Sequence, residues 1–290
     1  MSQLDKIINI FKCPVCGSSI QSEEAKNISC LNKHSFDISK EGYVNLLLSP
    51  VKTQYDKKLF LSRSIICRSG FFKPITDCIT DIIKEGINKT DNNSIKILDA
   101  GCGEGSHLAQ IIENLNGKSD AEYFGVGVDI SKEGIKMAAK NHSQNNVWCV
   151  ADITKTPFIN KGFNAVLNIL TPSNYTEFDR IIADNGLLIK AIPGSNYLKE
   201  LRNIFYNNTD KETYSNEKVL KYFSKHFDLC STRNIEYQVE LTRDNLEQLI
   251  NMTPLSWGAD DEEIQKTLTI GINKITVDMT VIVGKKNNIK

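Results

Sequence analysis

The segment "IKILDAGCGEGSHLAQIIENL", residues 95–115, joins a short apolar run to an amphipathic segment through a glycine-rich turn. An apolar run of strand length followed by apolar residues at helical spacing predicts a strand and then a helix. The turn holds Gly101, Gly103 and Gly105, whose missing Cβ atoms let the backbone bend sharply and approach a ligand before the helix begins. We therefore expect a strand–turn–helix unit that binds a small molecule at its turn.

Strand and helix patterns continue to alternate on the C-terminal side of this unit. They follow one another in "EYFGVGVDISKEGIKMAAK", "NVWCVADI", "FNAVLNIL", "NYTEFDRIIA" and "GLLIKAIPG". This alternation is typical of βαβ units around a parallel sheet, so the predicted fold class is α/β with a doubly wound, Rossmann-like sheet. The segment "KITVDMTVIVGKK", residues 274–286, alternates apolar and polar residues and is expected to close the sheet as its last strand.

Acidic residues stand at the ends of three predicted strands. Asp99 precedes the glycine turn, Asp129 ends the next strand and Asp152 follows the third. A carboxylate at the end of the second strand of such a sheet accepts hydrogen bonds from ribose hydroxyls. A nicotinamide site is one interpretation, but its G-x-G-x-x-G pattern requires a glycine where this chain has Ser106. The acids and glycines match better the S-adenosylmethionine sites of the class I methyltransferases, which this region resembles. A domain that retains the turn without activity is a further alternative.

The segment "CPVCGSSIQSEEAKNISCLNKH", residues 13–34, holds three cysteines and a histidine in two pairs. Cys13 and Cys16 form a C-x2-C knuckle, and Cys30 and His34 follow as C-x3-H. Two such pairs have the spacing of a tetrahedral zinc site. Four protein ligands leave no open position for a substrate, so we expect the metal to be structural and to contribute to folding of this segment. The alternative is four unrelated side chains, some of them small buried hydrophobes.

The composition is that of a globular protein with one large and one small domain. The chain has 290 residues, of which 40% are apolar and 24% charged, and Lys+Arg and Asp+Glu balance at 35 each. Residues 1–90 hold 13 basic and 9 acidic residues, a small surplus compatible with phosphate contacts. Since no apolar run has the length of a signal peptide or a membrane span, we expect a cytoplasmic protein without a membrane partner, whose eight cysteines stay reduced.

These patterns predict three regions along the chain. Residues 1–50 form the zinc-binding module, residues 51–90 a linker and helical lead-in, and residues 91–290 the cofactor-binding domain. The lead-in contains a predicted helix over residues 59–67. We expect the basic residues near this helix either to contact phosphates or to form a solvated face; they are Lys57, Lys58, Arg63 and Arg68. The aromatic residues Phe71, Phe72, Tyr175 and Trp257 are predicted to pack in the core, with base stacking as the alternative.

Several quoted segments in this order resemble the ribosomal RNA large subunit methyltransferase A family. They are the cysteine module with "SFDISKEGYVNLL", then "SGFFKPI", "LDAGCGEGSHL", "VDISKEGIKMAAK", "IPGSNYLKELRNIFYN" and "MTPLSW". The resemblance implies an enzyme that uses S-adenosylmethionine to methylate N1 of a guanine in a hairpin loop of large-subunit (23S) ribosomal RNA. It also implies that the zinc module recognises RNA and that the protein forms a homodimer.

The resemblance further implies a set of site residues. The implied cofactor-binding residues are Phe72, Asp99, Gly101, Gly103, Glu104, Gly105, Ser106, His107, Asp129, Ile130, Asp152, Ile153, Asn168 and Tyr197. The loop "NILTPSNY" is expected to face the target base, with Asn168, Thr171 and Pro172 as candidate catalytic residues. No general base is identified, and transfer is expected to depend mainly on orientation of the reactants and on electrostatics.

The chemistry of the target loop narrows the reaction and leaves two alternatives. N1 lies on the Watson–Crick edge of guanine, so the base must be unpaired or flipped. The Asn/Asp-Pro-Pro-aromatic loop used for exocyclic amines is absent here, which disfavours methylation of adenine N6. One alternative is a methyltransferase for a small molecule or a protein that retains zinc only as a staple. The other is a non-catalytic RNA-binding protein.

Overall fold

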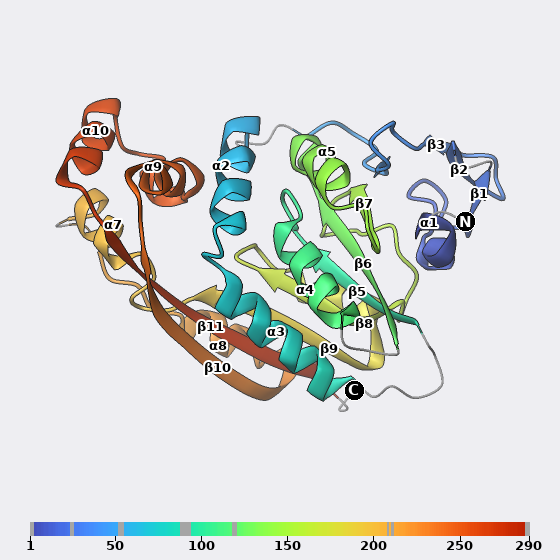
Figure 1. The fold of residues 1–290 in the computed structure, drawn as a ribbon. Coiled ribbons are helices and arrows are strands. Elements are labelled where there is room, and N and C mark those ends of the chain that lie inside the picture. The colour runs from blue at the N-terminus through green and yellow to red at the C-terminus, as the bar shows by residue number, and fades with distance from the viewer. Residues whose placement is uncertain are drawn as a thin grey trace.

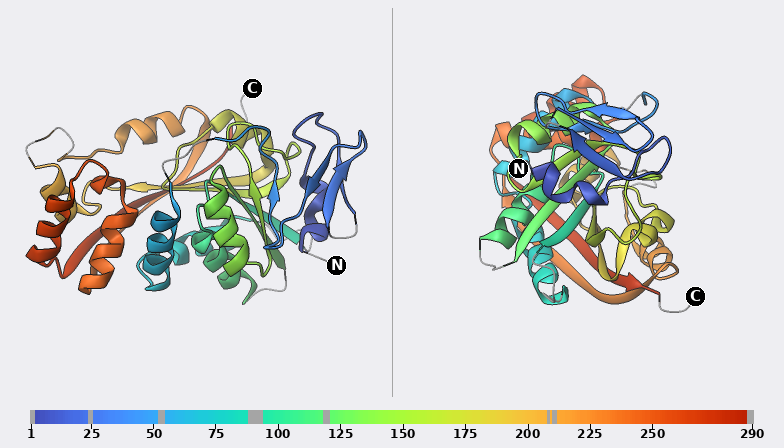
Figure 2. Two further views of the ribbon diagram at one scale, coloured as in Figure 1. Left: turned by 90° about the horizontal axis from the view of Figure 1, so that it is seen from above. Right: turned by 90° about the vertical axis from the view of Figure 1, so that its right-hand side faces the viewer.

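A computed structural model gives the fold of this chain (Figure 1). It describes residues 3–23, 26–51, 55–87, 94–117, 121–207, 209 and 212–287. Within these residues, no helix is both long and apolar enough to span a bilayer. A large sheet crosses the molecule, helices cover both of its faces, and a small module that contains the N-terminus lies at one end (Figures 1 and 2).

The main sheet has eight strands among the described residues, in the order β10-β11-β9-β8-β5-β6-β7-β4. Their bounds are β4 (Val44–Asn45), β5 (Ser94–Ala100), β6 (Glu122–Asp129), β7 (Asn146–Val150), β8 (Phe163–Ile169), β9 (Ile182–Pro193), β10 (Phe227–Glu240) and β11 (Lys274–Lys286). The strands from β4 to β9 pair in parallel, and β11 is antiparallel to both β9 and β10. The chain winds from the central β5 first towards β7 and then, through β8, in the opposite direction. This reversal leaves a crevice at the carboxyl ends of β5 and β8, where ligands bind in doubly wound sheets.

The predicted α/β, doubly wound, Rossmann-like sheet is confirmed, whereas the prediction for its last strand was wrong. Strand β11 lies between β9 and β10, not at an edge, and residues Ile275–Val283 are buried throughout. The polar positions stay buried because they have partners. The Thr276 hydroxyl donates to Glu200 Oε1 at 2.6 Å, and the backbone N–H of Asn196 donates to Asp278 Oδ2 at 2.8 Å.

Helices cover the two faces of the sheet and create two hydrophobic cores. On one face lie α3 (Lys73–Gly86), α4 (Ser106–Asn116) and α5 (Lys132–Asn141), and on the other lie α6 (Tyr175–Ile181) and α8 (Glu217–Phe223) (Figure 2). Neighbouring strand residues point to opposite faces, so Ile97 joins the first core and Leu98 the second. The site at the strand ends is therefore held by a sheet that is packed on both sides.

The lead-in segment forms α2 (Lys57–Arg68), which confirms the predicted helix and extends it slightly. Asp56 caps its start, because the side chain accepts the N–H of Leu59 at 2.8 Å. The helix packs beside α9 (Arg243–Met252), and Ser62 Oγ donates to Gln248 Oε1 at 2.8 Å. Three further elements lie near α9 at this end of the molecule: α7 (Lys199–Phe205), η2 (Pro254–Ser256) and α10 (Asp261–Ile270) (Figure 1).

The N-terminal module lies at the opposite end from α9 and α10 (Figures 1 and 2). It contains α1 (Gln3–Ile7), η1 (Ile8–Ile10), β1 (Ile20–Glu23), β2 (Asn27–Cys30) and β3 (Ser35–Asp37). Phe11 packs edge-on against Phe158 with ring centroids 5.0 Å apart, and the backbone N–H of Lys12 donates to the carbonyl of Pro157 at 3.0 Å. The predicted boundary at residue 50 stays a prediction; β4, which precedes it, already pairs with β7 of the main sheet.

Candidate functional site

The structure brings the four predicted metal ligands together. The ligand atoms of Cys13, Cys16, Cys30 and His34 all lie within 4.8 Å of one another. His34 Nδ1 lies 3.4 Å from Cys30 Sγ and 3.6 Å from Cys13 Sγ, and the Cys16 and Cys30 sulfurs are 3.7 Å apart. Tetrahedral zinc with sulfur ligands at about 2.3 Å places its donors roughly 3.5–3.8 Å apart. The Cys3His cluster therefore fits a structural zinc ion.

A cavity of about 1200 Å³ opens at the carboxyl ends of the central strands. Eight of the predicted cofactor-binding residues line it: Phe72, Gly101, Gly103, Asp129, Ile130, Asp152, Ile153 and Tyr197. Six others do not line this cavity: Asp99, Glu104, Gly105, Ser106, His107 and Asn168. The predicted set thus divides into residues that face the cavity and residues that support its wall.

The glycine turn needs residues without side chains for two separate reasons. Gly101 has a φ of 85°, and a Cβ atom there would lie 2.4 Å from Thr171 Oγ1. Gly105 has a φ of 86°, and its Cβ would lie 2.5 Å from the ring of Trp148. Both the left-handed backbone and the close packing exclude larger residues at these positions. The turn can therefore pass directly beside the cavity.

Asp129 holds the turn from the neighbouring strand. Its Oδ2 accepts the N–H of Gly103 and its Oδ1 accepts the N–H of Ser131, each at 2.8 Å. Burial raises the pKa of this carboxyl, while the N–H groups of Ser131 and Gly103 act to lower it. A carboxylate fixed in this way at the cavity wall fits the hydroxyl groups of a ribose.

Asp99 lies behind the turn and is only 2% exposed. Its Oδ1 has no hydrogen-bond partner among the described residues. Burial raises its pKa to about 7, with Asp129 and Glu104 acting in the same direction and Arg63 opposing them. Such an unpaired buried carboxyl is costly unless a cationic ligand approaches it.

Glu104 and His107 are buried in the wall beside the turn. Glu104 accepts a hydrogen bond from Ser106 Oγ at 2.6 Å. The ring of His107 packs edge-on against Phe72 with centroids 4.9 Å apart. Burial, together with Arg63, lowers the pKa of His107 to about 3, so the ring is neutral at physiological pH. These residues shape the wall that carries Phe72.

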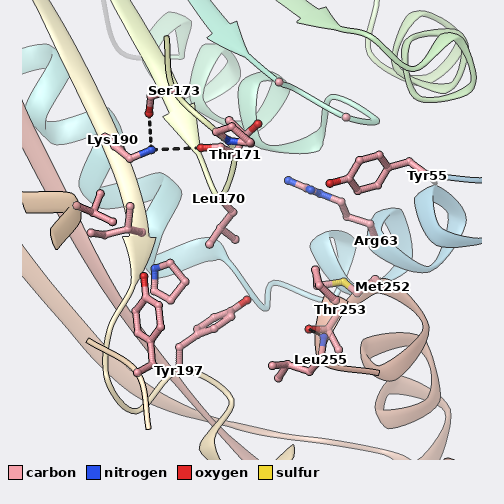
Figure 3. A pocket seen from close by; sticks show the side chains of 18 of the residues that line it. Tyr55, Arg63, Leu170, Thr171, Ser173, Lys190, Tyr197, Met252, Thr253 and Leu255 are labelled. Carbon is pink, nitrogen blue, oxygen red and sulfur yellow. Dashed lines mark hydrogen bonds between the residues drawn. The ribbon is translucent and has the colours of Figure 1, made fainter. Parts of the chain in front are cut away.

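Arg63 does not lie on a solvated face, which was one of its two predicted roles, and the phosphate contact stays a prediction. Its side chain is 20% exposed and points from α2 into the cavity (Figure 3). The Nε atom lies 3.8 Å from Glu104 Oε1, and Nη2 lies 3.3 Å from His107 Nδ1. Lys57, Lys58 and Arg68 are exposed, which is compatible with the solvated face.

The loop after β8 is fixed by a buried polar network. Asn168 donates to the carbonyls of Pro172 at 2.9 Å and Ala100 at 3.4 Å. Ser173 Oγ donates to Asn168 Oδ1 at 2.7 Å. Asn168 is fully buried, so the network holds the loop in place while Thr171 and Pro172 line the cavity.

Lys190 completes this network and was missed from the sequence. Its Nζ donates to Ser173 Oγ at 2.7 Å and to the Thr171 carbonyl at 3.2 Å (Figure 3). It also donates to Asn168 Oδ1. Burial lowers its pKa to about 8. The available signal was a single lysine inside the apolar run "LLIKAI" of a predicted central strand, because buried lysines are rare unless they are paired.

Four tyrosines form a further part of the cavity wall, which we call the tyrosine-lined end. Tyr175, Tyr206, Tyr214 and Tyr222 line this end together with Lys218. The predictions of core packing hold for Phe71, Phe72 and Tyr175, which are buried, and not for Trp257, which is 47% exposed. The cavity thus joins a turn suited to a cofactor with a wall suited to a planar base.

The fold and these two sites define a methyltransferase that carries a zinc ribbon. Residues 91–246 match the family described as "Methyltransferase domain", and residues 11–57 match the zinc-ribbon family described as "RlmA, N-terminal". The cofactor of this class is S-adenosylmethionine, and the ribbon holds a structural zinc ion. The cavity and the Cys3His cluster fit these two groups.

Similarity over the full chain gives the particular family. YxjB of Bacillus subtilis (strain 168), named as a candidate 23S rRNA (guanine-N1)-methyltransferase, is 38% identical over 96% of this chain and 98% of its own. The 23S rRNA (guanine(748)-N1)-methyltransferase of Streptomyces fradiae is 27% identical, with coverage of 96% and 97%. A candidate 23S rRNA (guanine-N1)-methyltransferase of Micromonospora griseorubida is 23% identical, with coverage of 93% and 94%. The chain belongs to the family of 23S rRNA (guanine-N1)-methyltransferases.

Proposed function

We propose that this protein transfers a methyl group from S-adenosylmethionine to N1 of a guanine in a hairpin loop of 23S ribosomal RNA. The observation that carries the proposal is the single cavity in which the glycine turn, the loop after β8 and the tyrosine-lined end meet. Its volume of about 1200 Å³ exceeds the range typical of a small-molecule site. A cofactor and a flipped base therefore fit side by side. The family relation supports the same reaction.

In this proposal the glycine turn and the strand ends hold the cofactor. Gly101 and Gly103 allow its methionine part to approach the backbone, while Asp129 accepts the ribose hydroxyls. Asp152 and Ile153, which follow the third strand, border the adenine, and Phe72 and Tyr197 also contact the cofactor from the cavity wall. The bound cofactor supplies the electrophilic methyl group.

The loop after β8 and the tyrosine-lined end receive the guanine. A ring of Tyr206, Tyr214 or Tyr222 offers a stacking surface for a flipped base, which gains about 1–3 kcal/mol from such contact. Thr171 and Pro172 are proposed to border the Watson–Crick edge. N1 must lose its proton as it is methylated, and the chain contributes mainly by holding both reactants in a dry cavity at reactive distance.

The remaining features of the proposal concern the protein as a whole. The zinc ribbon is proposed to contact the RNA hairpin, and the enzyme is proposed to act in the cytoplasm, where ribosomal RNA is found. We also propose a homodimer, which sedimentation velocity would test directly.

The test is transfer of tritium from labelled S-adenosylmethionine to 23S rRNA from a strain that lacks this gene. Nucleoside analysis should find the label in 1-methylguanosine, and primer extension would then map the position within its hairpin loop. Label in another nucleoside would overturn the guanine-N1 assignment. Absence of label in any RNA, with the cofactor still bound in calorimetry, would favour another substrate or a non-catalytic RNA-binding protein.

A further inference from the structure

We infer that Arg63 of α2 binds the carboxylate of the cofactor's methionine part, while Asp99 at the end of β5 binds its ammonium group. The inference deepens the proposed function, because it rests on S-adenosylmethionine as the cofactor. Arg63 lies outside the glycine turn and the strand-end acids. The assignment makes α2, the helix that follows the ribbon along the chain, part of the cofactor site.

The first argument is the position of the guanidinium. A Cβ atom built on Gly103 would lie 3.8 Å from both Cζ and Nη1 of Arg63. Gly103 and Arg63 line the same cavity, and the arginine side chain extends towards its centre (Figure 3). A ligand group that rests on the glycine turn therefore comes within reach of this guanidinium.

The second argument is the set of unused donors. A guanidinium carries five N–H donors in a planar fork that matches a carboxylate. Within the described part of the chain, Arg63 Nε has no hydrogen-bond acceptor, and its distance of 3.8 Å from Glu104 Oε1 is too long for one. Glu104 is instead bonded to Ser106 Oγ at 2.6 Å. The fork thus has capacity for another carboxylate.

The third argument is the carboxylate oxygen of Asp99 that lacks a hydrogen-bond partner. Asp99 Oδ1 is unpaired within the described residues and lies behind the glycine turn, so a cation in the cavity wall and an anion behind that wall both lack a hydrogen-bond partner at one atom. The methionine part of S-adenosylmethionine carries an ammonium and a carboxylate on one carbon atom. It therefore supplies a partner for Asp99 and one for Arg63. The reverse orientation would place like charges together at each residue. The carboxylate therefore points to α2 and the ammonium to β5.

A binding experiment isolates the carboxylate contact. Calorimetry would compare S-adenosylmethionine with decarboxylated S-adenosylmethionine, which keeps the sulfonium and the ammonium and lacks only the carboxylate. Wild-type protein should bind the complete cofactor roughly ten- to a hundredfold more tightly, as expected for a charge-assisted contact. Arg63→Met should reduce this ratio to about threefold or less, and Arg63→Lys should retain part of it.

The controls separate recognition from folding. Arg68→Met, on the exposed part of the same helix, should keep the wild-type ratio. If Arg63→Met weakens both ligands equally, or if wild-type protein does not distinguish them, the assignment is wrong. If Arg63→Met does not fold, the comparison of Arg63→Lys with wild type decides the question in the same way. Wild-type protein that binds neither ligand would overturn the cofactor assignment and the proposed function together, whereas binding without RNA methylation would overturn the proposed function alone.

Discussion

Asp129 links the glycine turn to the start of α5 through two backbone hydrogen bonds of 2.8 Å. Asp129→Ala removes the acceptor proposed for the ribose and also releases the turn. We expect affinity for S-adenosylhomocysteine, measured by calorimetry, to fall by about 1.5–3 kcal/mol, the value of hydrogen bonds to a charged group. Asp81→Ala, at an exposed position of α3, is the matched control and should bind normally. Unchanged affinity in Asp129→Ala would contradict the ribose assignment.

Asp99 predicts a pH dependence with a defined sign. Burial raises its pKa from 3.8 to about 7, so between these values the folded protein holds a proton that the unfolded chain has lost. The contribution of Asp99 to stability in the cofactor-free protein therefore decreases as pH rises from about 4 through about 7. An ammonium group beside the carboxylate favours its ionised form. Cofactor binding should then expel a proton and strengthen as pH rises from 6 to 8.

Calorimetry with S-adenosylhomocysteine at pH 6 and pH 8, in two buffers of different ionisation enthalpy, measures both the affinity and the proton release. Asp99→Asn should remove most of the difference between the two pH values. His107 does not contribute in this range, since its pKa is about 3. Equal pH dependence in wild type and Asp99→Asn would assign the effect to another group, such as Lys190 with its pKa of about 8.

At the scale of residues, the sequence predicted the site residues that lie close together along the chain. It did not predict those that reach the cavity from distant segments. The glycines and Asp129 stand within one strand–turn–helix–strand unit, where spacing along the chain determines spacing in the fold. Arg63 and Lys190 reach the cavity only because α2 and β9 pack beside it. Nothing in their local sequence specifies those contacts, apart from the rarity of a lysine within an apolar strand.

At the scale of elements, local sequence predicted the strands beside the glycine turn, but it did not predict the position of β11, which depends on distant segments. β5 and β6 are apolar runs beside a glycine turn, and their parallel pairing was predicted. β11 was misplaced because its alternating pattern is typical of a strand with one solvated face. Here α7 contributes Glu200 as a partner for Thr276, so polar residues on that face are buried with satisfied hydrogen bonds. Alternation indicates a strand but does not reveal what covers its second face.

The loop after β8 depends on one lysine, which gives an element-scale prediction. Lys190→Met should remove one hydrogen bond each from Asn168 Oδ1, Ser173 Oγ and the Thr171 carbonyl. We expect a loss of about 1–3 kcal/mol in the free energy of unfolding measured by denaturant titration. Methyl transfer should fall at least about tenfold because the loop shifts near the target base. Lys155→Met, an exposed change, should alter neither quantity, and normal turnover in Lys190→Met would exclude a positioning role.

At the scale of the whole molecule, the zinc cluster and the cofactor cavity are separate parts of one packed chain. None of the four ligands lines the cavity, and the ribbon lies at the end away from α9 and α10 (Figure 2). The side chains of Ile7, Phe11 and Ile28 from the N-terminal module nevertheless share a core with the sheet. Zinc therefore stabilises a module whose function, in our proposal, is to hold the RNA while the sheet holds the cofactor.

Because the zinc cluster and the cavity are separate, removal of the metal should impair RNA methylation and leave cofactor binding largely intact. Cys16 is the exposed ligand, so Cys16→Ser removes a thiolate with little change in packing. Zinc content should fall from about one ion per chain towards zero, and the ribbon should unfold, because metal binding supplies much of its folding energy. Affinity for S-adenosylhomocysteine should stay within about threefold of wild type, whereas transfer to 23S rRNA should fall at least about tenfold.

Cys230→Ser, at an exposed cysteine outside the cluster, is the matched control and should keep both zinc and activity. A zinc-free Cys16→Ser protein with a normal circular dichroism spectrum would contradict the structural role of the metal. Loss of cofactor binding in parallel with RNA methylation would show that the ribbon supports the whole fold through the shared core. Full RNA methylation without zinc would instead contradict the proposed role of the ribbon in RNA recognition, since the reaction would then depend on the sheet and its cavity alone.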